Sequence, residues 1–335
     1  MICLVEQHGR FSSIEWKESK ATAVAPRPQP PYHLLAEAPA YRGLPSPRLP
    51  PTREVFMARV VLHALRLLRQ FTTNPNSFLK AAKSLPDYLD ARDFARTFPA
   101  TSSADETPST NPLIEYFDRH REGRGIWKWR HYFDVYHRHL EKFVNRDIAL
   151  AEIGVFSGGS LDMWQHYLGR GARIHGIDLD ESTLTYSSDR VSIHIGDQES
   201  RTFWRQFRSD VPELHVMIDD GGHSPQQQRV SMEEMLPHLQ PGGVYICEDI
   251  VGESNDFSSY VGGLVASLNS GVAALESSAS GFQQAVYAIH CYPFITVVER
   301  TVNEAGPFLS QRHGTAWQPP LRLRDGYGKI AGRGA

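Results

Sequence analysis

The sequence predicts an α/β fold in which helices cover both faces of a mostly parallel sheet. Three observations predict it. Short apolar runs alternate with helical segments between residues 148 and 249, as in parallel strands that are joined by helices. A polar cluster follows each of five apolar runs, at the strand ends where ligands bind in open α/β sheets. Two further runs, residues 284–290 and 294–300, are joined by a tight turn and can therefore pair only antiparallel.

The first strand leads into a glycine-rich loop. The strand opens at Ile148 and ends at Glu152, and residues 154–160 then lead into a helix that starts near Leu161. Glycines let the backbone approach a ligand closely, and an acid at the end of the next strand can hydrogen-bond ribose hydroxyls. The segment predicts a site for a nucleoside-bearing cofactor. Its candidate contacts are Glu152, Gly154, Ser157, Gly159, Ser160 and, at the end of the second strand, Asp178.

The loop argues against a dinucleotide or a nucleoside triphosphate. Val155 and Phe156 follow Gly154, so the second glycine of G-x-G-x-x-G is missing and a pyrophosphate would meet a side chain. No G-x-x-x-x-G-K-[ST] segment occurs in the chain. The acidic Glu152 suits a cofactor with a cationic tail and no phosphate. S-adenosylmethionine (SAM) carries an ammonium and a sulfonium group and no phosphate, so we expect it as the cofactor.

The third and fourth strands also end in candidate cofactor contacts. Residues 191–195 form the third strand, and Asp197 and Gln198 behind it are candidate contacts to adenine. A turn formed by Gly-Asp-Gln is the alternative for these two residues. Residues 213–218 form the fourth strand, and Asp219 at its end completes the predicted cofactor contacts.

These motifs together resemble a known family. Residues from about 128 to 300 look like class I SAM-dependent methyltransferases, and most of all like the metal-dependent sugar O-methyltransferases of the mycinamicin methyltransferase type. The group labelled cephalosporin hydroxylase-like is also similar. The resemblance implies a Rossmann-like seven-stranded sheet of order 3-2-1-4-5-7-6. The matching segments are Glu152-Ile-Gly-Val-Phe-Ser-Gly-Gly-Ser-Leu-Asp-Met-Trp164, Gly176-Ile-Asp178, Asp219-Asp-Gly-Gly-His223, Pro241-Gly-Gly-Val-Tyr-Ile-Cys-Glu-Asp249 and Ile289-His-Cys-Tyr292.

Acidic residues behind the fourth and fifth strands predict a cation site. Asp220 lies just past the fourth strand, and Glu248 and Asp249 end the fifth, which opens at Val244. In this strand order the two strands are neighbours about 4.8 Å apart, so the acids can converge on one hard cation. Magnesium prefers carboxylate oxygens and keeps positions open for water or substrate. Capping of the following helix is the alternative role for the acids.

His223 is the candidate general base. An alkyl hydroxyl is a poor nucleophile near neutral pH and needs a base, a metal or both. His223 stands three residues past Asp220 on the same loop, and a plain loop or capping role is the alternative. The resemblance implies the same roles, namely a general base at His223 and metal-site carboxylates at Asp220, Glu248 and Asp249.

An aromatic segment, residues 125–136, precedes the first strand. Its spacing predicts an amphipathic helix that packs Trp129, Phe133 and Tyr136 into the core. The resemblance implies a second role, because relatives carry a similar segment near the mouth of the cofactor site. By that analogy Lys128, Trp129 and Tyr132 line the site.

Composition excludes some functions. The formal net charge of the 335 residues is −3, and no basic stripe indicates a nucleic-acid partner. Cys3, Cys247 and Cys291 show no metal-ligand spacing, which favours reduced thiols in an intracellular, cytoplasmic protein. Cys247 is expected to pack in a buried strand. No apolar run reaches the length of a membrane span.

The chain is expected to have four parts. Residues 1–54 are rich in proline and predicted to be disordered. Residues 55–111 are a helical extension and linker, residues 112–306 the SAM-dependent domain, and residues 307–335 a tail. The extension contains a basic helix, residues 56–71. It resembles a transit peptide or a membrane-surface helix, but packing on the domain, on a partner or on a second copy is the simpler interpretation.

Three functions remain open. The first is a SAM-dependent O-methyltransferase, assisted by Mg²⁺, that acts on a hydroxyl of a sugar or glycosylated small molecule. The second is a hydroxylase-like enzyme on the same scaffold, against which stands the lack of a convincing two-histidine, one-carboxylate pattern. The third is a non-catalytic SAM-binding protein, which the intact acids at the strand ends disfavour.

Overall fold

The computed structural model describes residues 64–65, 67–99, 110–252, 255–269, 279–303 and 313–316. The chain divides into two compact units, residues 1–104 and 105–335. The predicted disordered segment lies outside the described residues, and so does all of the predicted tail except residues 313–316. These two assignments therefore stay predictions.

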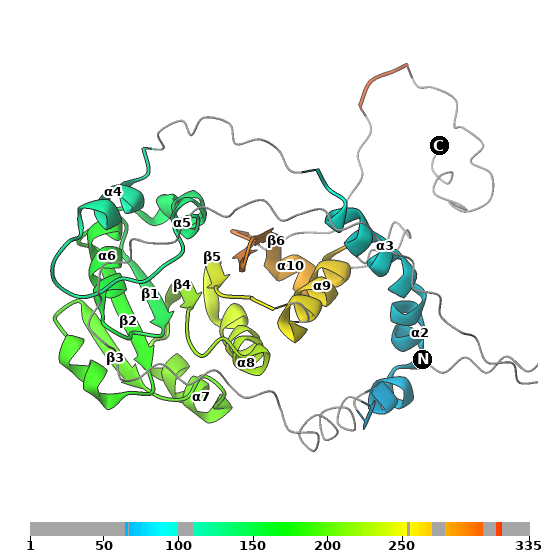
Figure 1. The fold of residues 1–335 in the computed structure, drawn as a ribbon, viewed down its shortest axis with the longest axis horizontal. Helices are drawn as coiled ribbons and strands as arrows, with labels where there is room; N and C mark the ends of the chain where they lie inside the picture. Colours follow the sequence, from blue (N-terminus) through cyan, green and yellow to red (C-terminus); the bar gives the residue numbers. More distant parts are fainter. Residues whose placement is uncertain are drawn as a thin grey trace, which may run out of the picture. The chain divides into compact units, whose positions relative to one another are not determined.

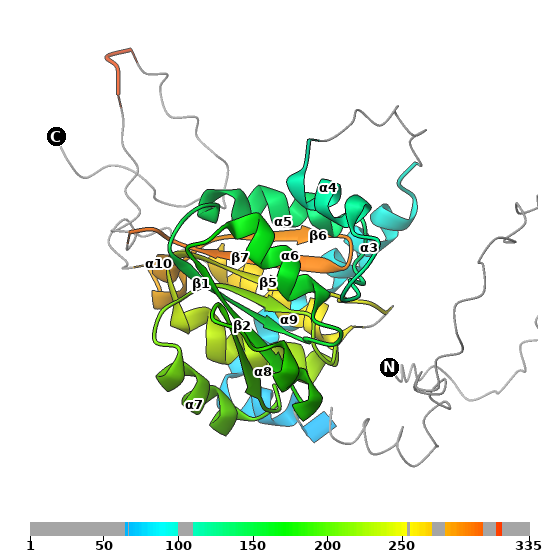
Figure 2. The ribbon, with the colours of Figure 1, turned by 90° about the vertical axis from the view of Figure 1, so that its left-hand side faces the viewer.

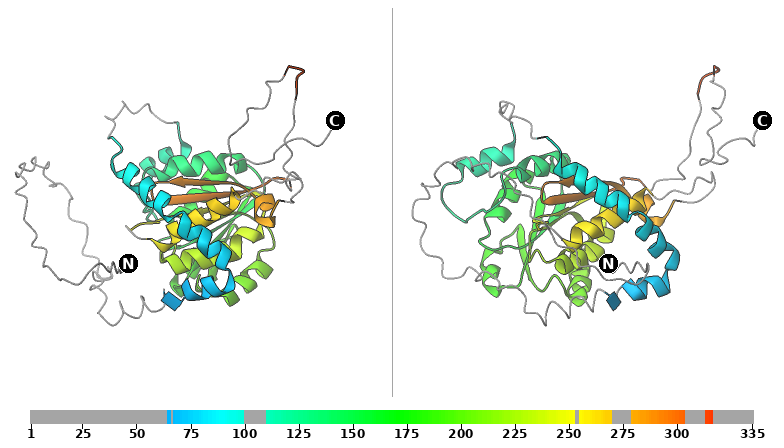
Figure 3. Two further views of the ribbon diagram at one scale, coloured as in Figure 1. Left: turned by 90° about the vertical axis from the view of Figure 1, so that its right-hand side faces the viewer. Right: turned by 45° about the vertical axis from the view of Figure 1, so that its right-hand side comes forward.

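The described part of the first unit is helical. Residues 67–73 are helical, and they are followed by α2 (Pro75–Lys83) and α3 (Leu85–Arg96). Figure 3 shows these helices in blue and cyan, with a change of direction between α2 and α3. A proline stands in the first turn of α3, where the missing amide hydrogen removes no helical hydrogen bond. Among all the described helices of the chain, none is both long enough and apolar enough to span a membrane.

The second unit contains a seven-stranded sheet of order β3-β2-β1-β4-β5-β7-β6, which confirms the predicted order. Figure 1 shows the part of this order from β3 through β2, β1 and β4 to β5. Strands β1 to β5 are parallel, whereas β7 is antiparallel to both β5 and β6. The strands are β1 (Ile148–Ile153), β2 (Ala172–Asp178), β3 (Val191–Ile195), β4 (Leu214–Asp219), β5 (Leu239–Cys247), β6 (Val286–Tyr292) and β7 (Ile295–Arg300).

Two strands differ from the prediction by more than one residue at their starts. β5 begins at Leu239 rather than Val244, because the Pro-Gly-Gly segment continues the strand and a register shift against β4 accommodates it. β6 begins at Val286 rather than at residue 284. The preceding residues instead form α10 (Gly281–Ala285), whose first turn is closed by a capping box between Ser280 and Gln283.

Helices cover both faces of the sheet, as predicted (Figure 2). On one face lie α4 (Pro112–Arg119), α5 (Tyr132–Leu140) and α6 (Gly159–Leu168), and on the other lie α7 (Arg201–Asp210), α8 (Pro225–Met235) and α9 (Asp256–Leu268). Three 3₁₀ segments, η1 (Glu141–Phe143), η2 (Glu181–Tyr186) and η3 (Leu236–His238), complete the described elements of this unit. We call the two sides the α5 face and the α8 face.

Each face has its own apolar core, and the alternation of the strands divides the side chains between them. In β4, Val216 and Ile218 point into the core under α5, whereas Met217 points into the core under α8. The predicted packing of Cys247 is confirmed, because its side chain is fully buried in the α8-face core.

Candidate active site

Three carboxylates gather on the α5 face, at the C-terminal ends of β1, β4 and β5. Glu152, Asp220 and Glu248 each stand two residues beyond an apolar side chain of the α5-face core. Because strand side chains alternate between faces, this spacing directs all three toward α5. The three strands are adjacent in the sheet, so the acids converge. We call these three residues the acid centre.

The side chain of Lys128 lies between the three acids. Its Nζ is 2.6 Å from Asp220 Oδ2, 3.2 Å from Glu152 Oε1 and 3.1 Å from Glu248 Oε2. The Lys128 side chain is 3% exposed, and those of Glu152 and Glu248 are 0% and 1% exposed. Lys128 therefore supplies one buried positive charge to three carboxylates, and in their ionised forms these carboxylates retain an excess of negative charge.

Burial perturbs the pKa values of this centre. It raises the pKa of Glu152, against the opposing charge of Lys128. The pKa of Glu248 lies well above its usual range, because the group is buried and faces the charge of Asp220. Burial lowers the pKa of Lys128, but the three surrounding carboxylates outweigh it and hold that pKa well above its ordinary value. Lys128 stays an ammonium, and a further cation beside the acids would favour their ionised forms.

A second set of ligating atoms adjoins the acid centre. One oxygen each of Asp220 and Asp249 and one ring nitrogen of His223 lie within 4.8 Å of one another. His223 Nε2 is 3.9 Å from Asp220 Oδ1 and 3.8 Å from Asp249 Oδ2. Its Nδ1 is buried and has no hydrogen-bond partner among the described residues. Glu248 contributes to the acid centre instead, through its contact with Lys128.

The backbone holds two of these residues in an uncommon conformation. His223 and Asp249 have φ angles of 55° and 52°, in the left-handed region, which costs a non-glycine residue about 1–3 kcal/mol. Two donors fix the Asp249 side chain, since Trp129 Nε1 and the Tyr132 hydroxyl lie 3.1 Å and 2.8 Å from Asp249 Oδ1. The surrounding contacts thus aim Asp249 toward His223.

In the glycine loop, other backbone segments pack directly against two of the glycines. A Cβ on Gly154 would lie 2.1 Å from the carbonyl oxygen of Asp220, and its φ is +90°. A Cβ on Gly159 would lie 2.4 Å from the carbonyl oxygens of Arg124 and Gly125. Both positions therefore require glycine for the fold itself, whatever ligand the loop binds.

The side chains around the loop connect it to the acid centre and to β2. Ser160 Oγ donates to Glu152 Oε2 at 2.6 Å, and Ser157 is half-buried in the same loop. Asp178 Oδ2 accepts hydrogen bonds from the backbone amides of Val155 and Phe156 at 2.9 Å and 3.1 Å. The end of β2 thus lies beside the loop that follows β1. The predicted contact of Asp178 with ribose stays a prediction.

The remaining predicted cofactor residues are divided between the surface and the α8 face. Asp219 follows Met217 in the alternation and points away from Asp220; it accepts hydrogen bonds from Gln198 and Tyr245 at 3.0 Å and 3.1 Å. Gln198 Oε1 in turn accepts from the amide of Gly222 at 2.7 Å. These buried groups hold the loop that carries His223. Asp197 is exposed and accepts from the amide of Glu199.

The aromatic segment corrects one prediction and supports another. α5 begins only at Tyr132, and the Trp129 side chain is half exposed rather than packed in the core as the helical spacing suggested. Phe133 and Tyr136 are fully buried, as predicted. The irregular segment before α5 turns Lys128 and Trp129 toward the acids. Sequence reasoning gave Lys128 a role only by analogy, because an isolated lysine outside any periodic element carries no signal of its partners.

Comparisons with known proteins identify similar methyltransferases. Residues 151–250 match the family described as methyltransferase domain. Demethylmacrocin O-methyltransferase from Streptomyces fradiae is 29% identical over 206 residues, which cover 54% of this chain and 51% of that protein. L-olivosyl-oleandolide 3-O-methyltransferase from Streptomyces antibioticus is 32% identical over 183 residues, which cover 52% of this chain and 45% of that protein. The chain thus spans about half the length of the curated relatives it matches.

The chain is also similar to a solved structure. It is the MycE methyltransferase from the mycinamycin biosynthetic pathway in complex with Mg and SAH; it is 22% identical and has a TM-score of 0.49. The alignment covers 60% of this chain and 56% of that one. The family match and the curated relatives confirm the resemblance predicted from the motifs: residues 151–250 match the methyltransferase domain family, and the chain is similar to O-methyltransferases.

Proposed function

We propose that this chain is a SAM-dependent O-methyltransferase that uses Mg²⁺ and methylates a hydroxyl of a sugar or a glycosylated small molecule. One observation carries the proposal: residues from three neighbouring strand ends form a buried centre with more carboxylates than cations. The names of relatives support the proposed acceptor class, and they include an L-olivosyl-oleandolide 3-O-methyltransferase and an α-L-rhamnosyl tetracenomycin-C 2′-O-methyltransferase.

In this proposal the glycine loop and its neighbours bind the methyl donor. Glu152 faces the ammonium and sulfonium charges of SAM, because a carboxylate favours a nearby cation. The loop lets the methyl donor approach the backbone at Gly154, Ser157, Gly159 and Ser160. When the donor binds, the Asp178 carboxylate gives up its hydrogen bonds with the loop amides and accepts hydrogen bonds from the ribose hydroxyls instead. The remaining donor contacts are those of the predicted set at the ends of β3 and β4, namely Asp197, Gln198 and Asp219.

The residues beside the acid centre fit a magnesium ion. Asp220 and Asp249 offer carboxylate oxygens within 4.8 Å of one another, and oxygen donors are those that Mg²⁺ prefers. Glu248 is the third predicted ligand and would have to share its carboxylate between Lys128 and the ion. When bound, the ion supplies a Lewis acid that makes a coordinated hydroxyl more acidic.

His223 is proposed as the group that accepts the hydroxyl proton. As the O–H bond breaks, the acceptor oxygen bonds to the methyl carbon, the carbon–sulfur bond breaks, and S-adenosylhomocysteine (SAH) leaves. The imidazolium that forms lies 3.8–3.9 Å from oxygens of Asp220 and Asp249. Two carboxylates at that distance stabilise the new positive charge, and so support a base role.

Calorimetry and a transfer assay test the proposal. We expect the full chain to bind SAM and SAH but not NAD, and to transfer a labelled methyl group from SAM to demethylmacrocin or to rhamnosylated tetracenomycin when Mg²⁺ is present. EDTA should abolish transfer, and added Mg²⁺ should restore it. Binding of NAD without binding of SAM would overturn the proposal as a whole. Transfer that is unaffected by EDTA would overturn only the magnesium part.

A further inference from the structure

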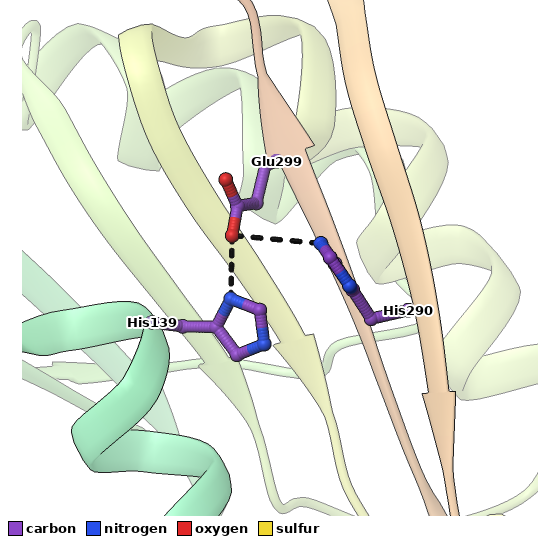
Figure 4. A group of neighbouring side chains, drawn as sticks. All are labelled: His139, His290 and Glu299. Carbon is purple, nitrogen blue, oxygen red and sulfur yellow. Dashed lines mark hydrogen bonds and ion pairs between the residues drawn. The ribbon is translucent and has the colours of Figure 1, made fainter.

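A second cluster of ligating side chains lies away from the strand ends. His139 comes from the last turn of α5, His290 from β6 and Glu299 from β7. Figure 4 shows the three side chains pointing toward one another across the α5 face of the hairpin. We call these residues the edge cluster, because β6 is the last strand of the sheet.

The edge cluster has the spacing of a metal site. One ring nitrogen of each histidine and one oxygen of Glu299 lie within 4.8 Å of one another. His139 Nδ1 is 2.5 Å from Glu299 Oε1, and His290 Nε2 is 3.6 Å from the same oxygen. Ligands of a tetrahedral zinc ion with bonds of 2.0–2.1 Å stand about 3.3 Å apart. The His139–Glu299 contact is shorter than this spacing by about 0.8 Å, so the His139 ring would have to move back by about that amount.

An unsatisfied atom points into the cluster. His290 Nε2 is buried and has no hydrogen-bond partner among the described residues. A buried nitrogen without such a partner costs free energy, and a metal bond would satisfy it.

A neighbouring tyrosine holds one ligand in a suitable orientation. The Tyr292 hydroxyl is 2.9 Å from His139 Nε2, the ring nitrogen that faces away from Glu299. With the ring proton on Nε2 and donated to Tyr292, the lone pair of Nδ1 points into the cluster. Such an outer hydrogen bond is typical of histidines that bind metals.

We propose that the edge cluster binds one transition-metal dication of the zinc class. Two imidazoles and one carboxylate suit Zn²⁺, whereas Mg²⁺ prefers oxygen ligands. The ion would join α5 to the β6–β7 hairpin, whose turn also contacts the active site, because the backbone oxygen of Phe294 accepts from Tyr132 at 3.2 Å and from the amide of Ile250 at 2.9 Å. The competing arrangement is a metal-free hydrogen bond between His139 and Glu299, with Lys142 Nζ 3.7 Å from the carboxylate.

Zinc binding by the full chain tests this proposal. Cys291 is exposed on the same strand as His290, so all variants carry Cys291→Ser, which removes a competing thiol. After dialysis against Zn²⁺ and removal of loose metal, we expect about one tightly held zinc per chain and a higher melting temperature. His290→Gln should abolish both effects. Tyr292→Phe should retain the site but weaken its zinc affinity roughly 10- to 100-fold, because it removes only the outer hydrogen bond.

Two controls separate this site from the proposed magnesium site. The double variant Asp220→Asn with Asp249→Asn should keep its zinc, because neither residue belongs to the edge cluster. Circular dichroism and melting without metal check that His290→Gln folds. Zinc that is lost in the double variant but retained in His290→Gln, or the absence of zinc binding in a folded chain, would overturn the inference. Neither result bears on SAM binding, so the proposed function is tested separately.

Discussion

The acid centre and the edge cluster occupy the same face of the same sheet, yet their chemistry differs. The acid centre uses three carboxylates around one buried ammonium. The edge cluster pairs two imidazoles with one carboxylate. Glu299 pairs with Val244 of β5, four residues before Glu248, which is about 13 Å along a strand. The two groups are therefore separate sites, and their donor atoms favour different cations.

The comparison also shows how the position of a site in the sheet determines which parts of the chain supply its side chains. Parallel strands bring their carboxyl ends to one edge of the sheet, so residues from distant parts of the chain meet there without any helix between them. The edge cluster instead lies within an antiparallel hairpin and needs α5 to supply its third side chain. We expect the first arrangement to serve chemistry on a bound ligand and the second to join elements of the fold.

The largest expected effect concerns His223 on the loop next to the acid centre. His223→Gln should lower the rate of methyl transfer roughly 10²- to 10⁴-fold, the usual contribution of a general base. Rates are measured with labelled SAM at saturating acceptor. His166→Gln, at an exposed position on α6, is the matched control and should transfer at the unaltered rate. If His223→Gln transferred as fast as the control, the base assignment would be wrong.

Substitution of one lysine at each site tests how much the positive charge contributes to stability there. Lys128→Met leaves three carboxylates without their buried counter-charge, and we expect the free energy of unfolding to fall by about 3–5 kcal/mol. Lys142 Nζ lies 3.7 Å from Glu299, and its side chain is 40% exposed. Lys142→Met should therefore cost less than about 1 kcal/mol. Urea denaturation measures both changes. Equal losses would show that Lys128 is no more important to the fold than a surface lysine.

Because the strands are regular, the sequence predicted acidic residues at neighbouring strand ends, but it assigned Glu152 to the cofactor and Asp220 and Glu248 to a cation rather than all three to one centre around Lys128. Glu152, Asp220 and Glu248 end neighbouring parallel strands, and their alternation with apolar residues fixes the face on which they lie. The same alternation explains why the side chains of the adjacent Asp219 and Asp220 point to opposite faces of the sheet. The alternation does not extend to the loops that follow these strands. Asp249 has a left-handed backbone conformation, which no sequence pattern predicts for a non-glycine residue.

Periodicity could not predict the edge cluster. Val286 packs in the α8-face core, so simple alternation would place His290 on that face as well. A register shift between Val286 and Ala288 reverses the alternation and turns His290 toward α5. Sequence analysis accordingly found no convincing pattern of two histidines and one carboxylate. The third ligand, His139, comes from a helix far away in the chain, and only the packing of α5 on the hairpin brings it close.

Two glycines extend the comparison to the backbone, because Gly154 follows the end of β1 whereas Gly242 lies near the start of β5. Gly154 and Gly242 both have positive φ angles, +90° and +76°, but a Cβ on Gly154 meets the backbone of Asp220 at 2.1 Å, whereas one on Gly242 meets a side-chain atom of Val302 at 3.3 Å. Gly242→Ala should cost about 1–2 kcal/mol from the left-handed backbone alone. Gly154→Ala should cost clearly more and should weaken SAM binding, because the loop must move. If urea denaturation gave equal losses of stability for the two variants, the loop would be able to accommodate the extra methyl group by a small backbone shift.

Two glutamates should give opposite pH dependences in metal-free protein. The pKa of Glu152 is raised, mainly by burial, so its contribution to stability is fully present below its ordinary pKa of 4.5 and is lost as the pH rises through the folded-state value. The pKa of Glu299 is lowered, mainly by its hydrogen bond with His139, so its contribution is present above pH 4.5 and is lost as the pH falls through the folded-state value.

The matched variants Glu152→Gln and Glu299→Gln separate these contributions, because glutamine does not titrate. Relative to the parent protein, Glu152→Gln should gain melting temperature as the pH rises from 4.5 to 7, since only the parent must ionise a buried carboxyl group there. Glu299→Gln should gain relative to the parent as the pH falls below 4.5, where only the parent loses its carboxylate. If both variants followed the parent at every pH, neither carboxyl group would have a pKa that differs between the folded and unfolded chain. The contrast between the two sites would then lie in their donor atoms alone.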